Sequence, residues 1–235
     1  SDLKSSWRFL ILGSLMSLYF VLMFEGLKTA SPLSMSVIYS LTPIMAGAFD
    51  FILVRRKMSG SVLIAILCGA FGAIWVIFDG DLEKLLNLNI GRGELLFILG
   101  CAGHALYAAL IPVLNRNEPP LSQTFGTLIA CTLLLSFVGY DQIFATEWVS
   151  LSLFVWMTTF YLAIFATAIS FFLIQFSARR LSSVKVMAYT YAIPFWVVCI
   201  HGIFEQNWPS ADLLYGGLAI GLALIFLLLI NAALS

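Results

Sequence analysis

The sequence predicts an all-α polytopic membrane protein. Of its 235 residues, 61% are hydrophobic and 10% are charged, whereas an ordinary soluble domain carries about 25% charged residues. The apolar residues gather into stretches of about 20 residues, and a helix of that length crosses the hydrocarbon core of a bilayer, about 30 Å thick. Short connections join the stretches, which leaves no room for a separate soluble domain.

The apolar stretches predict eight transmembrane helices in chain order. They cover residues 7–27, 32–54, 59–79, 93–114, 120–140, 149–177, 183–204 and 210–231. The first stretch is too long to be a cleaved signal peptide, and Ser182 and Ser183 offer a helix N-cap at the start of the seventh. The longest connection, residues 80–92, reads as a short turn at the membrane interface.

The basic residues indicate the orientation in the membrane. If both ends of the chain are cytoplasmic, nine of the twelve basic residues lie on the cytoplasmic side. They are Lys4, Arg8, Arg55, Arg56, Lys57, Arg116, Arg179, Arg180 and Lys185. The positive-inside rule therefore predicts cytoplasmic termini, and the expected location is the bacterial inner (plasma) membrane.

The cysteines and histidines do not form a pattern that binds a metal or a cofactor. Four cysteines lie singly in apolar stretches, without a Cys-x-x-Cys pair, and the two histidines are far apart in sequence. Structural metal sites need clustered ligands. We therefore expect inert buried thiols, no metal, no cofactor and no nucleic-acid partner; the sequence does not indicate an oligomeric state.

Two of the apolar stretches look like copies of one proline-broken helix. Pro43 and Pro194 are separated by 151 residues, and the same offset pairs Asp50 with His201. The offset maps the first three predicted helices onto the last three, which is a step of five helices. Because five is odd, the two copies face opposite sides of the bilayer and form an inverted-topology repeat.

The repeat divides the chain into two unequal units. Residues 1–79 hold three helices of the first unit, residues 80–92 form an external connecting loop, and residues 93–235 hold all five helices of the second unit. The first unit is two helices short. We therefore expect two further helices ahead of Ser1 in the complete fold, which would then have ten.

Several segments of the second unit resemble a known transporter family. They are residues 161–170 (YLAIFATAIS), residues 177–183 (SARRLSS), Pro194, Glu205 and the Gly216–Gly217 pair. These are similar to the repeat of the drug/metabolite transporter superfamily, and more narrowly to EamA-type permeases. The first unit resembles it through residues 27–32 (LKTASP), Pro43, Gly69 and Gly72, but has Val54-Arg55-Arg56 where the family has a glutamate. The resemblance implies a ten-helix secondary transporter.

Aromatic and proline residues inside the predicted helices are the candidates for a substrate cavity. Each proline removes a backbone donor and frees the carbonyl four residues earlier, at Tyr39 and Thr190; a simple helix kink is the alternative. Buried tyrosine hydroxyls need partners, so several face either a watery cavity or local partners in the core. The candidates are Tyr19, Tyr39, Pro43, His104, Tyr107, Trp156, Tyr189, Tyr191 and Pro194.

Four ionisable residues are candidates for proton coupling or gating: Asp50, His104, His201 and Lys185. Ionisable side chains at membrane depth are costly and are usually functional, and histidine titrates near neutral pH. The alternatives are that Asp50, His201 and Lys185 reach the polar interface, and that His104 makes a packing hydrogen bond between helices.

The sequence favours a secondary active transporter that works by alternating access. The resemblance implies small metabolites, such as amino acids or related amphipathic compounds, moved more often outward than inward, and proton coupling is a further hypothesis. The expected partners are a small-molecule substrate and membrane lipid, with protons as the partner that the coupling hypothesis adds. A channel or a lipid scramblase remains an alternative, and an integral-membrane enzyme is disfavoured because acid–base or metal residues are not clustered.

Overall fold

The computed structural model describes residues 6–30, 32–55, 58–78, 90–192 and 212–232, together with the single positions 81, 83, 86 and 87. Within these ranges every regular element is helical. Five of the described helices are long and apolar enough to cross a membrane, and two shorter apolar helices accompany them. The prediction of an all-α polytopic membrane protein is confirmed.

The helices follow the predicted apolar stretches closely. In chain order they are α1 (Trp7–Leu27), α2 (Pro32–Ser40), α3 (Thr42–Val54), α4 (Gly60–Ile77), α6 (Arg92–Leu114), α7 (Pro120–Val138), α8 (Tyr140–Ala145), α9 (Leu153–Tyr161), α10 (Ser170–Ala178), α11 (Ser183–Ala188) and α13 (Asp212–Ala232). A π-helical stretch, Leu162–Ile169, joins α9 to α10. Two short 3-10 turns, Trp148–Ser150 and Tyr189–Tyr191, precede α9 and follow α11.

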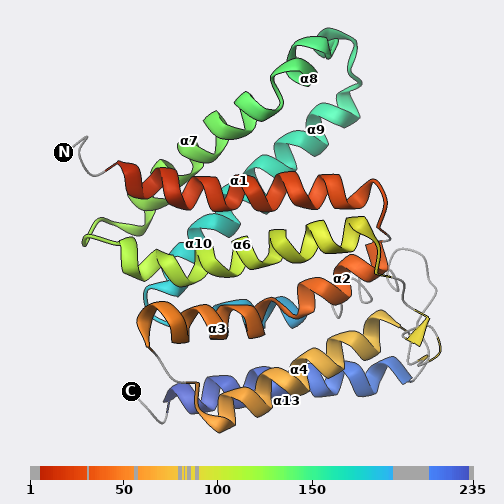
Figure 1. The fold of residues 1–235 in the computed structure, drawn as a ribbon, viewed down its shortest axis with the longest axis vertical. Coiled ribbons are helices and arrows are strands. Elements are labelled where there is room, and N and C mark those ends of the chain that lie inside the picture. Colours follow the sequence, from red (N-terminus) through yellow and green to blue (C-terminus); the bar gives the residue numbers. More distant parts are fainter. Residues whose placement is uncertain are drawn as a thin grey trace.

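The helices form a bundle in which α6 is the most buried of the long helices. Helix α1 packs against α6 and α7, and α6 also packs against α3. At the opposite edge, α4 packs against α13 (Figure 1). Trp7 at the start of α1 and Ala232 at the end of α13 lie at the same end of the bundle; we call it the basic end because Arg8, Arg55, Arg116 and Arg179 also lie there.

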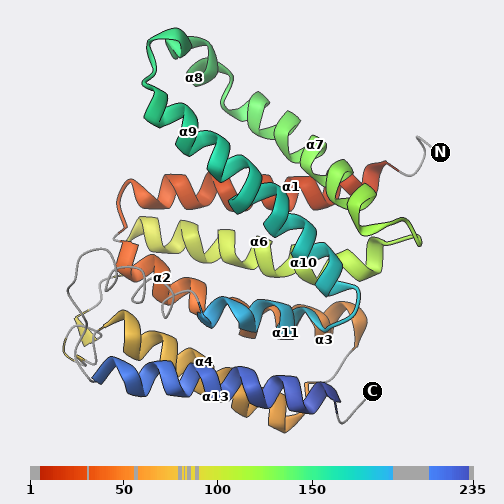
Figure 2. The same cartoon turned by 180° about the vertical axis from the view of Figure 1, so that it is seen from behind.

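Helices that the sequence pairs as repeats also lie next to each other. Helix α3 contacts α11, and α4 contacts α13. In both pairs the two helices run in opposite directions (Figure 2). The remainder of the seventh predicted helix, with Pro194 and His201, lies outside the described residues.

The break predicted at Pro43 lies between α2 and α3. Helix α2 ends at Ser40, and α3 begins at Thr42 with Pro43 in its first turn. The hydroxyl of Thr42 donates to the carbonyl of Tyr39 at 2.6 Å, so the carbonyl that proline frees has a partner within the chain. Thr190, which the 151-residue offset pairs with Tyr39, donates its own hydroxyl to the carbonyl of Met187 at 2.6 Å.

The helix from α9 to α10 is the least buried of the long helices. Only 6% of its apolar window is buried, against 56% for α6. Its apolar side chains, including Phe154, Phe160 and Phe165, are exposed along one face of the bundle. The predicted stretch 149–177 is thus helical from Leu153 to Ala178, but little of this chain packs on it.

Glycines set how closely α1 approaches α6. A Cβ placed on Gly93 would lie 2.6 Å from the carbonyl oxygen of Gly26 and 2.8 Å from the amide nitrogen of Ala30. Both are backbone atoms that cannot rotate away. Small residues permit such close helix contacts in membranes, so Gly93 fixes the crossing of α1 and α6.

We predict that Gly93→Ala destabilises the protein, because the added methyl group forces the two helices apart; overpacking of this kind costs about 1–3 kcal/mol. The measurement is thermal unfolding of the detergent-solubilised protein. Gly221→Ala on α13 is the matched control, since nothing lies within 4 Å of a Cβ at that position. Equal melting temperatures for the two variants would contradict the prediction.

Candidate functional site

Aromatic rings from four helices gather around His104 in the middle of the bundle. The His104 ring on α6 lies 4.7 Å from the ring of Tyr19 on α1 and 6.0 Å from that of Tyr39 on α2, between centroids. Tyr107, one turn further along α6, lies 6.3 Å from His104. Phe171 on α10 closes the group at 5.9 Å from Tyr107. We call these five residues the His104 cluster.

The imidazole of His104 is buried within this cluster and is incompletely paired. Its relative exposure is 4%, and its Nδ1 atom has no hydrogen-bond partner among the described residues. Nearly all buried polar atoms in folded proteins are paired with protein or water. An unpaired nitrogen among aromatic rings therefore marks a position suited to a polar group of a bound molecule.

Three further residues predicted to line the cavity, Tyr189, Tyr191 and Trp156, lie outside the His104 cluster. Tyr191 is buried in the separate core between α4 and α13, where its ring packs on Gly69, and its hydroxyl has no partner among the described residues. Tyr189 is 42% exposed. Trp156 is exposed on α9 and packs against Trp148 and Phe160.

Asp50 holds a position between the two predicted units. It is buried near the end of α3, and its Oδ2 accepts from the backbone N–H of Ser183 at 3.2 Å, in the first turn of α11. A carboxylate at a helix N-terminus satisfies a free N–H and complements the helix dipole. Lys185, two residues further along α11, is also buried. Asp50 thus lies inside the protein, where its carboxylate bonds to the backbone of α11.

A buried polar group that the sequence analysis missed adjoins the His104 cluster. The side-chain amide of Gln175 on α10 donates to the hydroxyl of Tyr107 at 3.2 Å and to that of Thr127 on α7 at 3.3 Å. The Oε1 atom of Gln175 has no partner among the described residues. A glutamine inside an apolar stretch is a detectable signal, because polar residues in membrane helices face protein or a cavity.

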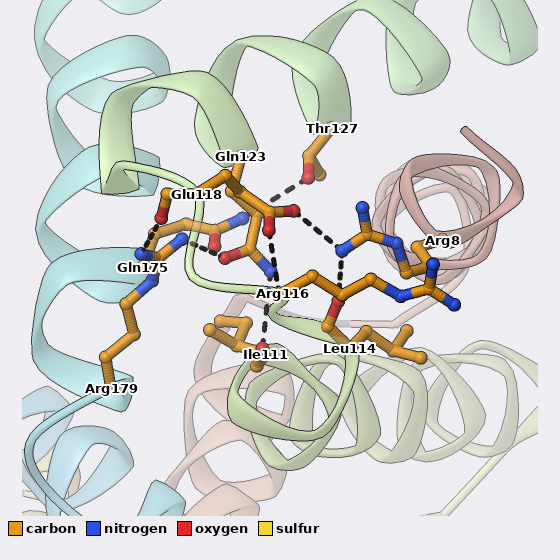
Figure 3. Close-up of polar contacts among 9 residues, drawn as sticks. All are labelled: Arg8, Ile111, Leu114, Arg116, Glu118, Gln123, Thr127, Gln175 and Arg179. Atoms are coloured by element: carbon orange, nitrogen blue, oxygen red, sulfur yellow. Dashed lines mark hydrogen bonds and ion pairs between the residues drawn. The ribbon is translucent and has the colours of Figure 1, made fainter. Parts of the chain in front are cut away.

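Charged residues meet at the basic end of α6, as Figure 3 shows. The Nη1 atom of Arg8 donates to the carboxylate of Glu118 at 2.7 Å and to the carbonyl of Leu114 at 2.6 Å. Arg179 donates to the carbonyl of Glu118 and to the side-chain oxygen of Gln123. The bond from Arg8 to Leu114 satisfies a carbonyl that the end of α6 leaves free.

The surroundings of Glu118 favour its charged form. Partial burial by itself would raise the pKa of Glu118, but hydrogen bonds from its own N–H and that of Arg116, and the guanidinium of Arg8, outweigh burial. The pKa of Glu118 is therefore lowered from its ordinary value. The ion pair with Arg8 persists at neutral pH.

The described apolar helices define an integral-membrane protein, and comparison with known proteins shows its family. The chain belongs to the EamA-like transporter family, which it matches over residues 1–78 and 91–230. The resemblance to EamA-type permeases is confirmed, and the family is one of membrane transporters rather than enzymes.

Two relatives from Bacillus subtilis (strain 168) are similar to this chain. One is the "Uncharacterized transporter YyaM", 25% identical over 195 residues, which cover 81% of this chain and 63% of that protein. The other is the "Uncharacterized transporter YetK", 22% identical over 215 residues, which cover 91% of this chain and 64% of that protein. The chain thus spans less than two thirds of the length of both relatives.

A solved crystal structure has the same fold. It superposes on this chain with a TM-score of 0.70 at 16% sequence identity, and the match covers 97% of this chain and 88% of the other. At this identity the likeness concerns the arrangement of the helices alone.

We predict that the stability of the protein falls in acid partly through Glu118. A lowered pKa means that the contribution of this carboxylate is complete above the ordinary pKa of about 4.3 and is lost as pH falls through the lowered value. Melting temperatures of the wild type and Glu118→Gln, measured from pH 7 to pH 3, check this. The difference between them should shrink as pH falls; a constant difference would contradict it.

Proposed function

We propose that the protein is a secondary active transporter that moves small amphipathic metabolites, such as amino acids or related compounds, by alternating access. The unpaired Nδ1 of His104 within a ring of aromatic side chains is the observation that supports this proposal most directly. Aromatic walls with few polar groups are typical of sites for small molecules. The direction we propose is export.

The His104 cluster draws residues from both predicted units. Tyr19 and Tyr39 belong to residues 1–79, whereas His104, Tyr107 and Phe171 belong to residues 93–235. In transporters built from inverted repeats, the substrate site lies near the bilayer midplane where the repeats meet. When the two units tilt against each other, the walls of such a site separate on one side at a time.

We propose that two further helices of the full-length protein cover the exposed face of Leu153–Ala178. Helix α1 packs against α6 and α7, the first two helices of the second unit. The predicted repeat equates α1 with this α9–α10 helix, whose window is 6% buried. The equivalents of α6 and α7 in the first unit would pack on it in the same way.

We predict that this face is shielded from lipid in the full-length protein. Single cysteines in a cysteine-free background at Ile164, 50% exposed here, and at Ile225 on α13, 55% exposed, form a matched pair. In membranes, an apolar maleimide dissolved in the lipid should label Ile225→Cys and spare Ile164→Cys. Equal labelling would mean that lipid, and not protein, covers both positions.

We predict saturable, concentrative uptake by the full-length protein in proteoliposomes, with tritiated leucine and phenylalanine as probes under an imposed pH gradient. His104→Phe keeps an aromatic ring but removes both nitrogens. Because a lost hydrogen bond to a buried group costs about 1–3 kcal/mol, its initial rate should fall about fivefold or more. Tyr140→Phe, on the exposed helix α8, is the control and should retain the wild-type rate.

The same assay separates the alternatives. Non-concentrative flux that does not saturate would indicate a channel, and movement of a fluorescent phospholipid between leaflets would indicate a scramblase. Either result without concentrative uptake would overturn the proposal.

Proton coupling through Asp50, His104 and His201 forms a finer part of the proposal. The triple variant Asp50→Asn, His104→Gln and His201→Gln should lose the dependence of transport on the pH gradient. Asp50→Asn alone retains an oxygen that can accept from the N–H of Ser183. This variant therefore tests the charge of Asp50 while it keeps the hydrogen bond that caps α11. Unchanged pH dependence in the triple variant would exclude these residues as proton carriers.

A further inference from the structure

We propose that Arg8, Glu118 and Arg179 form a gate that closes the basic end of the transport path. This inference rests on the proposed transport function and assigns a role to residues at one end of the bundle rather than at its centre. The three residues come from the start of α1, the connection between α6 and α7, and the end of α10 (Figure 3). We call them the Arg8 gate.

The ion pair of the gate joins the two predicted units. Arg8 belongs to the first unit, and Glu118 belongs to the second. Their side chains are 8% and 16% exposed, and the pair measures 2.7 Å. The same Arg8 nitrogen also donates to the carbonyl of Leu114 at the end of α6. Any tilt that moves the start of α1 away from α6 must break both contacts.

Breaking the pair has very different costs in dry and wet surroundings. Separating two partly buried charges leaves each one unpaired in a medium of low dielectric, which is strongly unfavourable. Once water enters, it solvates both charges and the cost becomes small. The ion pair therefore stabilises the closed state, in which the basic end is dry. It also permits an open state in which water solvates both side chains. An intermediate with separated, unsolvated charges is not stable.

Helix α10 connects the gate with the His104 cluster. Gln175 and Arg179 are four residues apart, so they lie on the same face of the helix. Gln175 donates to Tyr107 of the cluster, and Arg179 donates to the carbonyl of Glu118 in the gate. A displacement of α10 therefore changes both contacts together, which links the state of the site to the state of the gate.

The segment before α10 is suited to such a displacement. Residues Leu162–Ile169 are π-helical, and π-helical turns are often found at functional sites within longer helices. The face of this stretch is exposed, so few contacts of this chain hold it in place. Helices α9 and α10 can thus tilt relative to each other about this stretch.

The opposite end of the bundle has a different kind of polar contact between the units. There the hydroxyl of Ser34 on α2 donates to the carboxylate of Glu94 on α6 at 2.7 Å. The described ion pair at that end, Lys28 with Glu25, lies within one unit and is well exposed. A hydroxyl–carboxylate bond does not leave two separated charges when it breaks. Of these polar contacts between the units, the ion pair at the basic end therefore costs more to break in dry surroundings.

A buried cysteine offers a direct test of the gate. Cys101 on α6 is 0% exposed and packs with Phe97 beside the cluster. In the full-length protein with every other cysteine replaced by serine, a charged, membrane-impermeant thiol reagent added from the basic end should label Cys101 slowly. Cys101 lies beyond His104 as seen from the basic end, so the rate of labelling reports how often a path from that end past the His104 cluster is open.

Glu118→Gln and Arg8→Gln should each raise the labelling rate about fivefold or more, because each removes the charge attraction that holds the end closed. The charge-swapped double variant Arg8→Glu with Glu118→Arg should bring the rate back toward that of the parent. Arg116→Gln is the matched control: its side chain is exposed in the same connection, and only its backbone N–H contacts Glu118.

Unchanged rates in both single variants would overturn the gate, as would an equal increase in Arg116→Gln. If a single variant fails to fold, Arg8→Lys, which keeps the charge, and the swapped pair provide the same comparison. Transport measured in parallel separates the two proposals. If the wild type transports a probe but the labelling rates of the single variants are unchanged, the gate alone is overturned. If the wild type transports none of the probes, the proposed function is overturned, whatever the labelling rates are.

Discussion

The contact between α1 and α6 is the interaction on which the rest of the structure depends. At one end the helices touch through backbone at Gly26 and Gly93, and at the other Arg8 bonds to the last carbonyl of α6. The side chains of His104 and Tyr19 meet between these two points. Because lipid cannot satisfy polar groups, each polar atom along this contact must find its partner in the protein or in what the protein binds.

Local features of the fold could be predicted from the sequence, because they depend on neighbouring residues. Hydropathy located the helices to within a few residues at most described ends, and proline chemistry located the break before Pro43. The π-helical stretch was not predicted, since it reflects a shift of backbone hydrogen bonds that composition does not encode. The number of helices in the complete protein and the inverted repeat remain predictions.

The candidate site was harder to predict, because it depends on which way each helix faces. Four of the residues predicted to line a cavity, Tyr19, Tyr39, His104 and Tyr107, lie in contact with one another. Their role in binding a substrate is a proposal. Trp156 has the same composition signal but lies outside the cluster. Gln175 was overlooked because it is a single polar residue in an apolar stretch, and Glu118 because loop charges are usually taken as markers of topology alone.

The hydroxyl of Thr42 has a consequence for how the broken helix α2–α3 behaves. Its bond to the carbonyl of Tyr39 spans three residues of one short segment, so it moves with that segment and needs neither a neighbouring helix nor water. The Tyr39 carbonyl therefore keeps its hydrogen-bond partner when the chain bends at Leu41. Bending there does not bring a bare carbonyl into the hydrocarbon, where an unpaired polar group costs several kcal/mol, and the membrane itself offers little resistance to the hinge.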